Sequence, residues 1–317
     1  MASRVLITGG AGFLGSAIAR SLASTDGLRV TVIDDLSAGN AARLSGIEHL
    51  RLVEGSILDE RALDEAFADR PDVVVHMAAS FANQRSVEDP LSDLRTNAEG
   101  TLRLLARALA GGVGLFVHAS SSCVYGDAPG PLDEVESPLR PYTPYAVSKL
   151  AAEQMVAFYC RYHDLPAVVL RYFNCYGPGE EASHYRGVVA RFVRAALLGE
   201  PLVVTGSGNE TRQFLFLDDA ARATVLAIRA GSGISGTVLN VASGRSTGIL
   251  DLARTILEVS RSRSPIHIGP ARAWDVVRHR AASTRRAEET IGFTASTPLR
   301  DGLRTTVDCA NASGPLR

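Results

Sequence analysis

Tyr145 and Lys149 are the two residues of this sequence whose types and spacing are best suited to joint chemistry. On a helix, side chains four residues apart lie on one face, so we expect the phenol and the ammonium to lie side by side. A neighbouring cation favours phenolate and lowers the pKa of a phenol from about 10. A shift of roughly three units corresponds to about 4 kcal/mol of differential interaction. The pair predicts a general base, and an ordinary surface helix is the alternative interpretation.

A glycine-rich segment near the N-terminus predicts a dinucleotide site. Residues 10–15 read GAGFLG, between an apolar run at residues 4–7 and a helical pattern at residues 14–23. In that context the glycines permit a tight turn and close backbone approach, and the start of the helix receives a pyrophosphate. A tight turn without a ligand is the alternative. The predicted contacts are Gly9, Gly12, Phe13, Leu14 and Gly15.

Asp34 ends the second predicted strand, where a dinucleotide site places a carboxylate on the ribose. A carboxylate at this place accepts a hydrogen bond from a 2′-hydroxyl and repels a 2′-phosphate. It therefore predicts NAD, rather than NADP, as the cofactor. Asp35 is adjacent and is the alternative ribose ligand or a helix cap; we expect Asp34 to face the ribose.

The elements that must position these residues alternate along the first half of the chain. Strands are predicted at residues 4–7, 29–33, 50–53, 72–76, 115–118 and 167–171. Helices are predicted at residues 14–23, 59–68, 91–109 and 145–162. This alternation predicts an α/β fold with a Rossmann-like, doubly wound parallel sheet.

The pattern changes after residue 174 and predicts a smaller, discontinuous second domain. We expect a loop at residues 177–183, a helix at 188–198, a strand at 202–205 and a turn at 206–209. Residues 214–217, a helix from Asp218 and a strand at 238–241 are expected to return to the main sheet. The tail predicts a helix at 250–259, an irregular stretch at 265–278 and a helix at 299–309. The predicted domains are residues 1–174 plus about 212–245, and about 175–211 plus 246–317.

Composition excludes several classes of partner. The 317-residue chain has a net charge of −1 and no polybasic run, which argues against nucleic acid and anionic membranes. Its four cysteines lack a C-x-x-C spacing, so we expect a reduced, cytoplasmic protein without a metal. No targeting segment or apolar run of about 20 residues is visible.

Seven short motifs together resemble the extended short-chain dehydrogenase/reductase family, which includes nucleotide-sugar epimerases and dehydratases. They are GGAGFLG at 9–15, VHMAA at 75–79, NAEGT at 97–101, SSSCVYG at 120–126, YAVSK at 145–149, RYFN at 171–174 and TRQF at 211–214. Their order and spacing match the family across nearly the whole chain. The resemblance implies an NAD-binding Rossmann domain, a smaller domain that holds a nucleoside diphosphate sugar, and a homodimer.

The resemblance also implies a role for each matching residue. Tyr145 corresponds to the base, Lys149 to its ribose-binding partner, and Ser121 to a hydroxyl that bonds the sugar O4 and shares the migrating proton. Further cofactor contacts are implied for Ser56, Ile57, Ala78, Ala79 and Phe173. Further substrate contacts are implied for Ser122, Asn174, Val188, Arg212 and Arg272.

Ser122 and Cys123 bear on the reaction, because they follow the hydroxyl residue Ser121. Family dehydratases place an acidic or acid–base pair at these two positions, and family decarboxylases place a glutamate there. Their absence predicts 4-epimerisation through a transient 4-keto sugar, most simply between UDP-glucose and UDP-galactose or a close derivative. The alternatives are a UDP-glucuronate 4-epimerase and a nucleotide-sugar 4-ketoreductase. A non-catalytic dinucleotide sensor is a remote alternative, because it has no need of a tuned base.

Three departures from the family pattern leave the substrate open. Ser56 stands where an adenine-facing aspartate is usual, and Thr205 stands where an aromatic residue near the nucleobase is common. Trp274 replaces a glycine, and the register after it determines whether His279 or Arg280 lies beside the sugar. An arginine there suits an acidic sugar such as a glucuronate, and a histidine suits a neutral one. Further candidate partners of a carboxylate are Arg186 and Arg191.

Three polar residues are expected to be structural. His76 and His118 end predicted strands and are expected to be hydrogen-bonded core residues. Asn97 is expected to stabilise the loop beneath the cofactor by hydrogen bonds.

Overall fold

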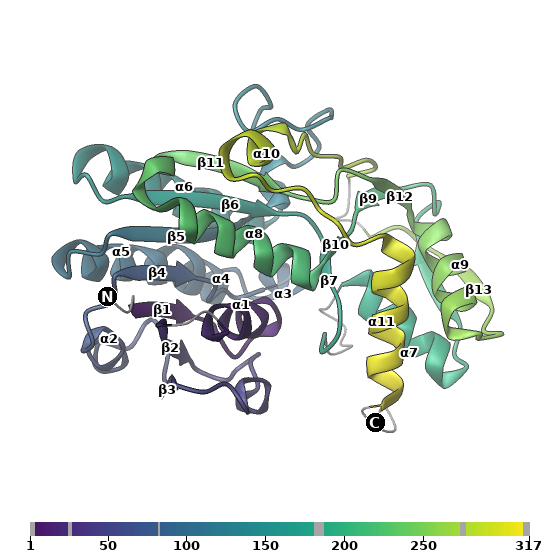
Figure 1. The fold of residues 1–317 in the computed structure, drawn as a ribbon. Coiled ribbons are helices and arrows are strands. Elements are labelled where there is room, and N and C mark those ends of the chain that lie inside the picture. Colours follow the sequence, from purple (N-terminus) through teal and green to yellow (C-terminus); the bar gives the residue numbers. More distant parts are fainter. Residues whose placement is uncertain (1–3, 25–26, 82, 181–186, 273–276, 313–317) are drawn as a thin grey trace.

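A seven-stranded parallel sheet forms the centre of the structure, a computed structural model that describes residues 4–24, 27–81, 83–180, 187–272 and 277–312 (Figure 1). The strand order is β11-β6-β5-β4-β1-β2-β3. The strands are β1 (Arg4–Thr8), β2 (Arg29–Asp34), β3 (Leu50–Glu54), β4 (Val73–His76), β5 (Leu115–Ser121), β6 (Ala167–Tyr172) and β11 (Thr237–Val241). The predicted α/β, Rossmann-like sheet is therefore confirmed, because parallel neighbours require helical crossovers between them.

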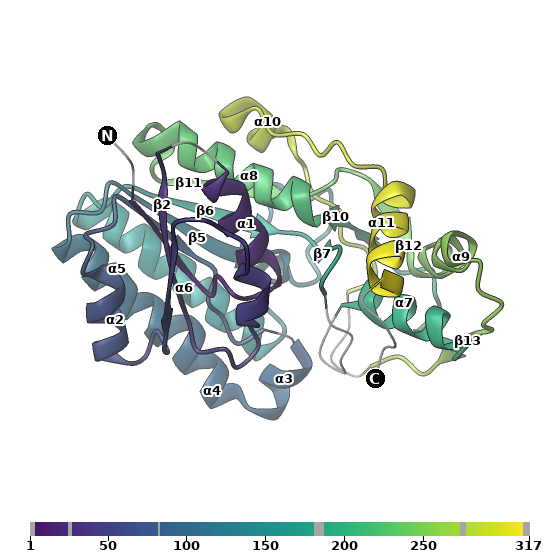
Figure 2. The same cartoon turned by 60° about the horizontal axis from the view of Figure 1, so that its bottom comes forward.

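Helices cover both faces of this sheet (Figure 2). One face carries α1 (Phe13–Ala23), α8 (Leu217–Ala230) and α10 (Arg285–Ile291). The opposite face carries α2 (Glu60–Phe67), α5 (Gly100–Ala110) and α6 (Pro144–Tyr162). Strands enclosed in this way are buried on both sides, which is why they read as continuous apolar runs.

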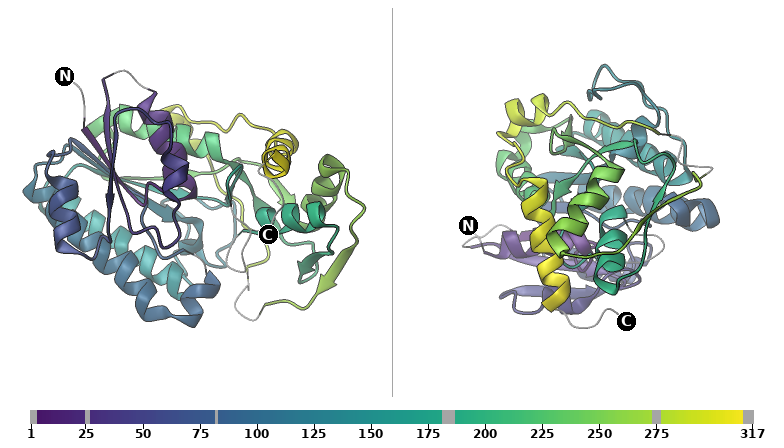
Figure 3. Two further views of the ribbon diagram at one scale, coloured as in Figure 1. Left: turned by 90° about the horizontal axis from the view of Figure 1, so that it is seen from below. Right: turned by 90° about the vertical axis from the view of Figure 1, so that its right-hand side faces the viewer.

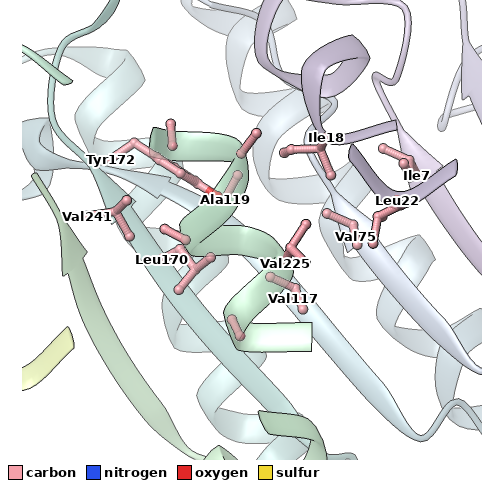
Figure 4. Close-up of a cluster of buried hydrophobic side chains, with 14 of the residues drawn as sticks. Ile7, Ile18, Leu22, Val75, Val117, Ala119, Leu170, Tyr172, Val225 and Val241 are labelled. Atoms are coloured by element: carbon pink, nitrogen blue, oxygen red, sulfur yellow. The ribbon is translucent and has the colours of Figure 1, made fainter. Parts of the chain in front are cut away.

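Side chains alternate between the two cores along each strand. Ile7 and Val75 pack against Ile18 of α1 (Figure 4). The preceding residues, Leu6 and Val74, belong to the opposite cluster beneath α2 and α5. This period of two residues is a property of extended backbone, and the parallel direction of the strands brings their carboxyl ends to one edge of the sheet.

The chain between β4 and α5 differs from the single helix predicted at residues 91–109. α3 (Asn83–Glu88) and α4 (Pro90–Leu94) come first, and a π-helical turn at Arg95–Glu99 then leads into α5. Single π turns inside helices are frequent at functional sites. This turn carries Asn97, whose hydrogen bonds lie beneath the cavity described below.

A smaller lobe lies beside the carboxyl ends of the main-sheet strands (Figure 3). Its helices are α7 (Val188–Leu198), α9 (Ile249–Ser260) and α11 (Leu299–Ala312), and its parallel strands are β8 (Leu202–Thr205) and β13 (Ile266–Gly269). A separate apolar cluster that includes Phe192, Leu252 and Leu303 holds the lobe together. The other short strand pairs are β7 (Cys175–Tyr176) with β10 (Leu215–Phe216), and β9 (Thr211–Gln213) with β12 (Ser246–Gly248).

Two expectations for the second half of the chain are wrong. Residues 215–216 pair with β7 outside the main sheet, whereas α8 packs on the main sheet and β11 joins it, as expected. The stretch expected to be irregular contains β13, whose side chains His267 and Ile268 are exposed, so it lacks the buried apolar pattern that marks a strand. The division into two domains at residue 174 stays a prediction.

Candidate active site

A cavity of about 590 Å³ opens where the carboxyl ends of β1, β4 and β5 face the smaller lobe. The strand order reverses between β1 and β4, and open parallel sheets bind ligands at such a point. Its lining includes the predicted cofactor residues Gly9, Gly12, Phe13, Leu14, Gly15, Asp34, Ser56, Ile57, Ala78 and Ala79. It also includes the predicted catalytic and substrate residues Ser121, Ser122, Tyr145, Lys149, Asn174, Val188, Arg212 and Arg272.

Phe173 is the one predicted site residue outside this lining. Its ring is fully buried and packs against Tyr125, with ring centroids 6.3 Å apart. The next residue, Asn174, does line the cavity and donates from Nδ2 to the Gln213 carbonyl across 3.0 Å. The position of the Phe173 side chain therefore does not support the predicted contact with the cofactor.

The glycine loop between β1 and α1 is shaped for close approach. A Cβ on Gly9, where φ is +68°, would lie 2.6 Å from the Ala78 amide nitrogen. A Cβ on Gly15 would overlap the Gly9 carbonyl oxygen and lie 2.8 Å from the Gly10 Cα. Gly12 is the N-cap of α1 and supplies no side-chain cap, which leaves first-turn amides of the helix to an anionic ligand.

Asp34 lies against this loop. Its Oδ2 accepts from the Ala11 amide and its Oδ1 from the Leu36 amide, both across 2.9 Å. Burial raises the pKa of the Asp34 carboxyl, while these amide bonds act to lower it. Asp35 is exposed and instead accepts from the Ser37 amide and hydroxyl. The glycine cradle, the uncapped helix and the buried carboxylate together fit a dinucleotide, with Asp34 as the ribose ligand.

Ser121, Tyr145 and Lys149 meet at the far end of the cavity. Ser121 ends β5, and its Oγ accepts from the Cys123 amide across 3.2 Å at the start of a 3₁₀ turn. Thr143 caps α6 through the Ala146 amide, which places Tyr145 and Lys149 in the first turns of that helix. Lys149 Nζ donates to the Ala119 carbonyl across 2.9 Å. Both side chains are buried, so the pair lies on the face of α6 that packs against the core. The alternative interpretation, an exposed surface helix, is therefore excluded.

Burial dominates the electrostatics of this pair. It raises the pKa of the Tyr145 phenol above its ordinary value, and the neighbouring Ser121 hydroxyl acts in the opposite direction. Burial also lowers the pKa of Lys149 to about 8, against the charges of Asp93 and Glu153. The predicted fall in the Tyr145 pKa is therefore not met by the protein itself, because burial penalises the charged phenolate. Lys149 is also the only lysine in the chain, and every other basic side chain except histidine is arginine.

A buried network supports the floor of the pocket. Asn97 Oδ1 accepts from the Ser80 amide across 2.8 Å, and its Nδ2 donates to Ser148 Oγ across 3.0 Å and to Asp93 across 3.1 Å. The predicted role of Asn97 beneath the cofactor loop is thus confirmed. Asp93 was not predicted from the sequence. The structure identifies it as a buried carboxylate on α4, the helix that packs against α6.

A second network, not predicted from the sequence, lies behind Lys149. Glu153 forms a buried ion pair with Arg171 at 2.7 Å and accepts a hydrogen bond from Ser120. Arg171 also donates to Tyr125 Oη, which in turn donates to Asn240 Oδ1. The network joins α6 to strands β5, β6 and β11. Glu153 stands four residues after Lys149, a spacing that could have identified it.

The two strand-end histidines differ from each other. His76 bonds through both ring nitrogens, to Thr8 Oγ1 at 2.7 Å and Thr101 Oγ1 at 2.8 Å, as expected. His118 is fully buried, and neither ring nitrogen has a hydrogen-bond partner among the described residues, so the expectation is wrong for it. Burial and the Lys149 charge hold the pKa of both histidines well below the ordinary value.

Arginines gather at the side of the cavity formed by the smaller lobe. Arg212 donates to the carbonyls of Thr211, Val277 and Arg278 at 2.8–3.1 Å. Burial and the charge of Arg272 lower the pKa of Arg191, which shows that these two guanidinium groups lie near each other. Guanidinium groups assembled in a cavity are suited to an anionic ligand such as a diphosphate. The sequence positions 186, 274 and 275 lie outside the described residues.

Pairing with β9 decides which of the neighbouring residues His279 and Arg280 faces the cavity. Thr211 forms a β-bridge with His279, whose Nδ1 lies 3.0 Å from Thr211 Oγ1, and His279 is exposed. Arg280 is buried and lines the cavity. Arg280, and not His279, therefore faces the cavity.

Comparison with known proteins agrees with this geometry. Residues 5–242 match the NAD dependent epimerase/dehydratase family. The chain belongs to this family. Its membership confirms the resemblance found in the sequence motifs and the prediction of NAD as the cofactor.

Relatives within the NAD dependent epimerase/dehydratase family differ in their reactions. The chain is 34% identical to a UDP-glucose 4-epimerase of Mycolicibacterium smegmatis, covering 96% of this chain and 97% of the relative. It is 34% identical to a dTDP-glucose 4,6-dehydratase of Streptomyces niveus (96% and 92%) and 32% identical to a UDP-N-acetyl-alpha-D-glucosaminuronate decarboxylase of Bacillus cytotoxicus (97% and 97%). Membership therefore narrows the activity to NAD-dependent chemistry on nucleotide sugars.

A solved structure of a UDP-glucose 4-epimerase from Thermotoga maritima, determined with UDP-glucose, superposes with a TM-score of 0.92. The two chains are 33% identical, and the match covers 98% of this family member and 99% of the other chain. The whole architecture, including the smaller lobe, is thus common to both proteins.

No helix among the described residues combines the length and apolar character that crossing a bilayer requires. Within the same residues, no group of three His, Cys, Asp or Glu side chains is arranged to hold a metal ion.

Proposed function

We propose that this family member is an NAD-dependent 4-epimerase of a nucleoside diphosphate sugar, acting through a transient 4-keto sugar. UDP-glucose and UDP-galactose, or a close derivative, are the simplest substrates. The observation that carries the proposal is the convergence of Ser121, Tyr145 and Lys149 in one cavity, with Ser122 and Cys123 following Ser121. Exchange at C4 needs one base and one hydroxyl and no further acid.

The residues of the chain handle the proton. Tyr145 takes the proton of the C4 hydroxyl, and Ser121 holds the C4 oxygen through its own hydroxyl. Lys149 supplies a cation that is anchored on the Ala119 carbonyl and offsets the phenolate charge. The glycine loop and Asp34 would hold NAD, which would accept the hydride from C4 and give it back. Oxidised NAD would also contribute a positive charge to the site. Once the 4-keto sugar presents its other face, return of the hydride to C4 and of the Tyr145 proton to the C4 oxygen would give the epimer.

Dehydration and decarboxylation are disfavoured for this chain although relatives carry them out. Both reactions need an acid or base beyond the tyrosine, and the position after Ser122 holds the thiol of Cys123. The Cys123 sulfur lies 3.7 Å from Asn83 Nδ2 and 3.7 Å from an Arg280 nitrogen. These contacts fit a side chain that shapes the pocket.

Two alternative functions differ in their need for Ser121, Tyr145 and Lys149. A 4-ketoreductase would use the same three residues, and a cofactor sensor would need none of them.

The test is turnover of purified protein on UDP-, dTDP-, GDP- and CDP-sugars without added reductant. We expect product epimers with catalytic amounts of NAD. Turnover that requires stoichiometric NADH or NADPH would replace the proposal with a reductase. Tyr145→Phe should abolish turnover and retain NAD binding, while Tyr142→Phe, an exposed tyrosine three residues earlier, serves as the matched control.

We also propose the homodimer that the resemblance implied. Neighbouring helices α5 and α6 present exposed apolar side chains: Leu102, Leu109, Val147, Phe158 and Tyr162. Exposed apolar side chains gathered on two neighbouring helices are typical of an interface. Light scattering on the protein and on Phe158→Asp tests it, and a monomeric parent protein would refute it.

A further inference from the structure

Arg280 is a buried cation that lacks an anionic partner among the described residues. Its side chain is 8% exposed, and its Nε makes no hydrogen bond in the described structure. Its two other nitrogens make only long contacts, 3.7 Å to the Cys123 sulfur and 3.4 Å to the Gly126 carbonyl. Arg171, by contrast, is equally buried but is paired with Glu153 at 2.7 Å. A buried charge without a partner is unfavourable, and Arg280 lines the cavity, so an anionic ligand group would satisfy it.

The fold holds Arg280 at the reacting end of the cavity. Its amide donates to the Thr211 carbonyl across 3.2 Å, and Ala282 bridges to Leu132, so the backbone on both sides is fixed. The guanidinium extends to the turn after β5, where the Cys123 amide is bonded to Ser121 Oγ. A ligand group bound by Arg280 therefore lies near the sugar and not near the dinucleotide loop.

The diphosphate has other cations available to it. Arg212 is held by the carbonyls of Val277 and Arg278, and Arg191 and Arg272 lie near each other on the same lobe. The charge of Arg280 is thus additional to a set that already suits two phosphates. A planar guanidinium whose Nε makes no hydrogen bond and whose Nη atoms make only long contacts matches the geometry of a carboxylate.

We propose that Arg280 binds a carboxylate on the sugar, and that the substrates are nucleoside diphosphate sugars that carry one, such as hexuronates. This inference rests on the proposed 4-epimerase function and specifies its substrate class. The carboxylate would occupy the space bounded by Arg280, Cys123 and the buried Ser122, all of which line the cavity.

The experiment compares kcat/KM for UDP-glucuronate and UDP-glucose in the parent protein, Arg280→Gln and Arg280→Lys. We expect the parent to prefer UDP-glucuronate, and Arg280→Gln to lower the ratio of the two values on the order of 100-fold. Arg280→Lys should recover part of that loss, because it restores the charge without the planar fork. Arg278→Gln removes the same charge from an exposed neighbouring side chain and is the matched control.

Binding of UDP alone separates the sugar from the diphosphate. The dissociation constant for UDP should change less than about threefold in Arg280→Gln; a loss as large as that for UDP-glucuronate would assign Arg280 to the diphosphate and overturn the inference. A parent protein that epimerises UDP-glucose in preference to UDP-glucuronate would overturn it too, and would leave the 4-epimerase function in place. Absence of turnover on every nucleotide sugar would instead refute that function. The comparison of substrates in the parent needs no variant and decides the matter even if Arg280→Gln fails to fold.

Discussion

Lys149 Nζ donates a hydrogen bond to the Ala119 carbonyl across 2.9 Å, two residues before Ser121 on β5. The bond crosses from α6 to the central sheet and ties the helix that carries Tyr145 to the strand that carries Ser121. It also uses a buried ammonium, whose nearest stabilising charges are the carboxylates of Asp93 and Glu153. The bond therefore fixes where Lys149 lies relative to both of these elements.

The pKa of Lys149 can be measured directly, because the chain has no other lysine. With ¹³C-labelled lysine, the single Cε signal should titrate with a midpoint of about 8, well below the ordinary value of 10.5. Asp93→Asn should lower that midpoint further, since the Asp93 charge raises it. A midpoint near 10.5 in the folded protein would contradict the burial of the ammonium.

The same shift predicts how stability depends on pH. Between pH 8 and 10.5 the unfolded chain keeps the Lys149 proton and the folded chain releases it, so this residue makes the protein more stable as pH rises. Below pH 8 both states hold the proton, and the contribution is constant. The difference in unfolding free energy between the parent and Lys149→Met should change by about 2 kcal/mol from pH 7.5 to 9.5 in urea titrations. Parallel pH profiles would argue against the shift.

Asp34 should control the choice between NAD and NADP. Asp34→Asn removes the charge that repels a 2′-phosphate and weakens the acceptor for the ribose, so we expect NAD affinity to fall by about tenfold and the preference over NADP to shrink. Asp35→Asn changes an exposed carboxylate one residue later and should alter NAD affinity less than about threefold. Calorimetric titration with both nucleotides gives the two ratios. Equal effects of the two substitutions would reject Asp34 as the specific ligand.

The buried pair of Glu153 and Arg171 should contribute strongly to stability. Glu153→Gln leaves the guanidinium in the core without its counter-charge, and the expected loss is about 3 kcal/mol in unfolding free energy. Asp251→Asn breaks an exposed pair, in which Asp251 and Arg254 are 69% and 60% exposed, and should change stability by less than about 0.5 kcal/mol. Urea unfolding of both variants measures the contrast. Similar small losses would mean that Arg171 finds sufficient partners in Tyr125 alone.

Gly15→Ala should damage both the fold and the cofactor site. The new methyl group would overlap the Gly9 carbonyl and push α1 away from β1, so we expect a loss of about 2 kcal/mol or more and weaker NAD binding. Gly233→Ala is the control, because a Cβ there has no atom within 4 Å. Thermal unfolding and NAD titration report the two effects separately. Normal NAD affinity in Gly15→Ala would show that the loop tolerates the displacement.

Most of the main sheet was predictable because its strands are buried on both faces. The valine run of β4 predicts a strand without knowledge of the adjacent strands, and the glycine loop predicts the turn into α1. β13 was not predictable in the same way, because its exposed side chains carry no buried pattern and its pairing with β8 joins residues distant in sequence. The π turn at Arg95–Glu99 was missed because its sequence, RTNAE, contains a single apolar residue and so cannot show a change of period.

For the site, local motifs were enough to predict Ser121, Tyr145 and Lys149 as the reacting set, and all three line one cavity in the structure. Tertiary structure decided their electrostatics, because desolvation depends on what the chain packs around a side chain and not on its neighbours in sequence. It likewise decided that Arg280, and not His279, lines the cavity, through the pairing of Thr211 with His279 across 68 residues. Side-chain period makes adjacent residues face opposite ways, so a shift of one residue would exchange the two. That register is a property of the assembled strands, and it determines which side chain faces the cavity.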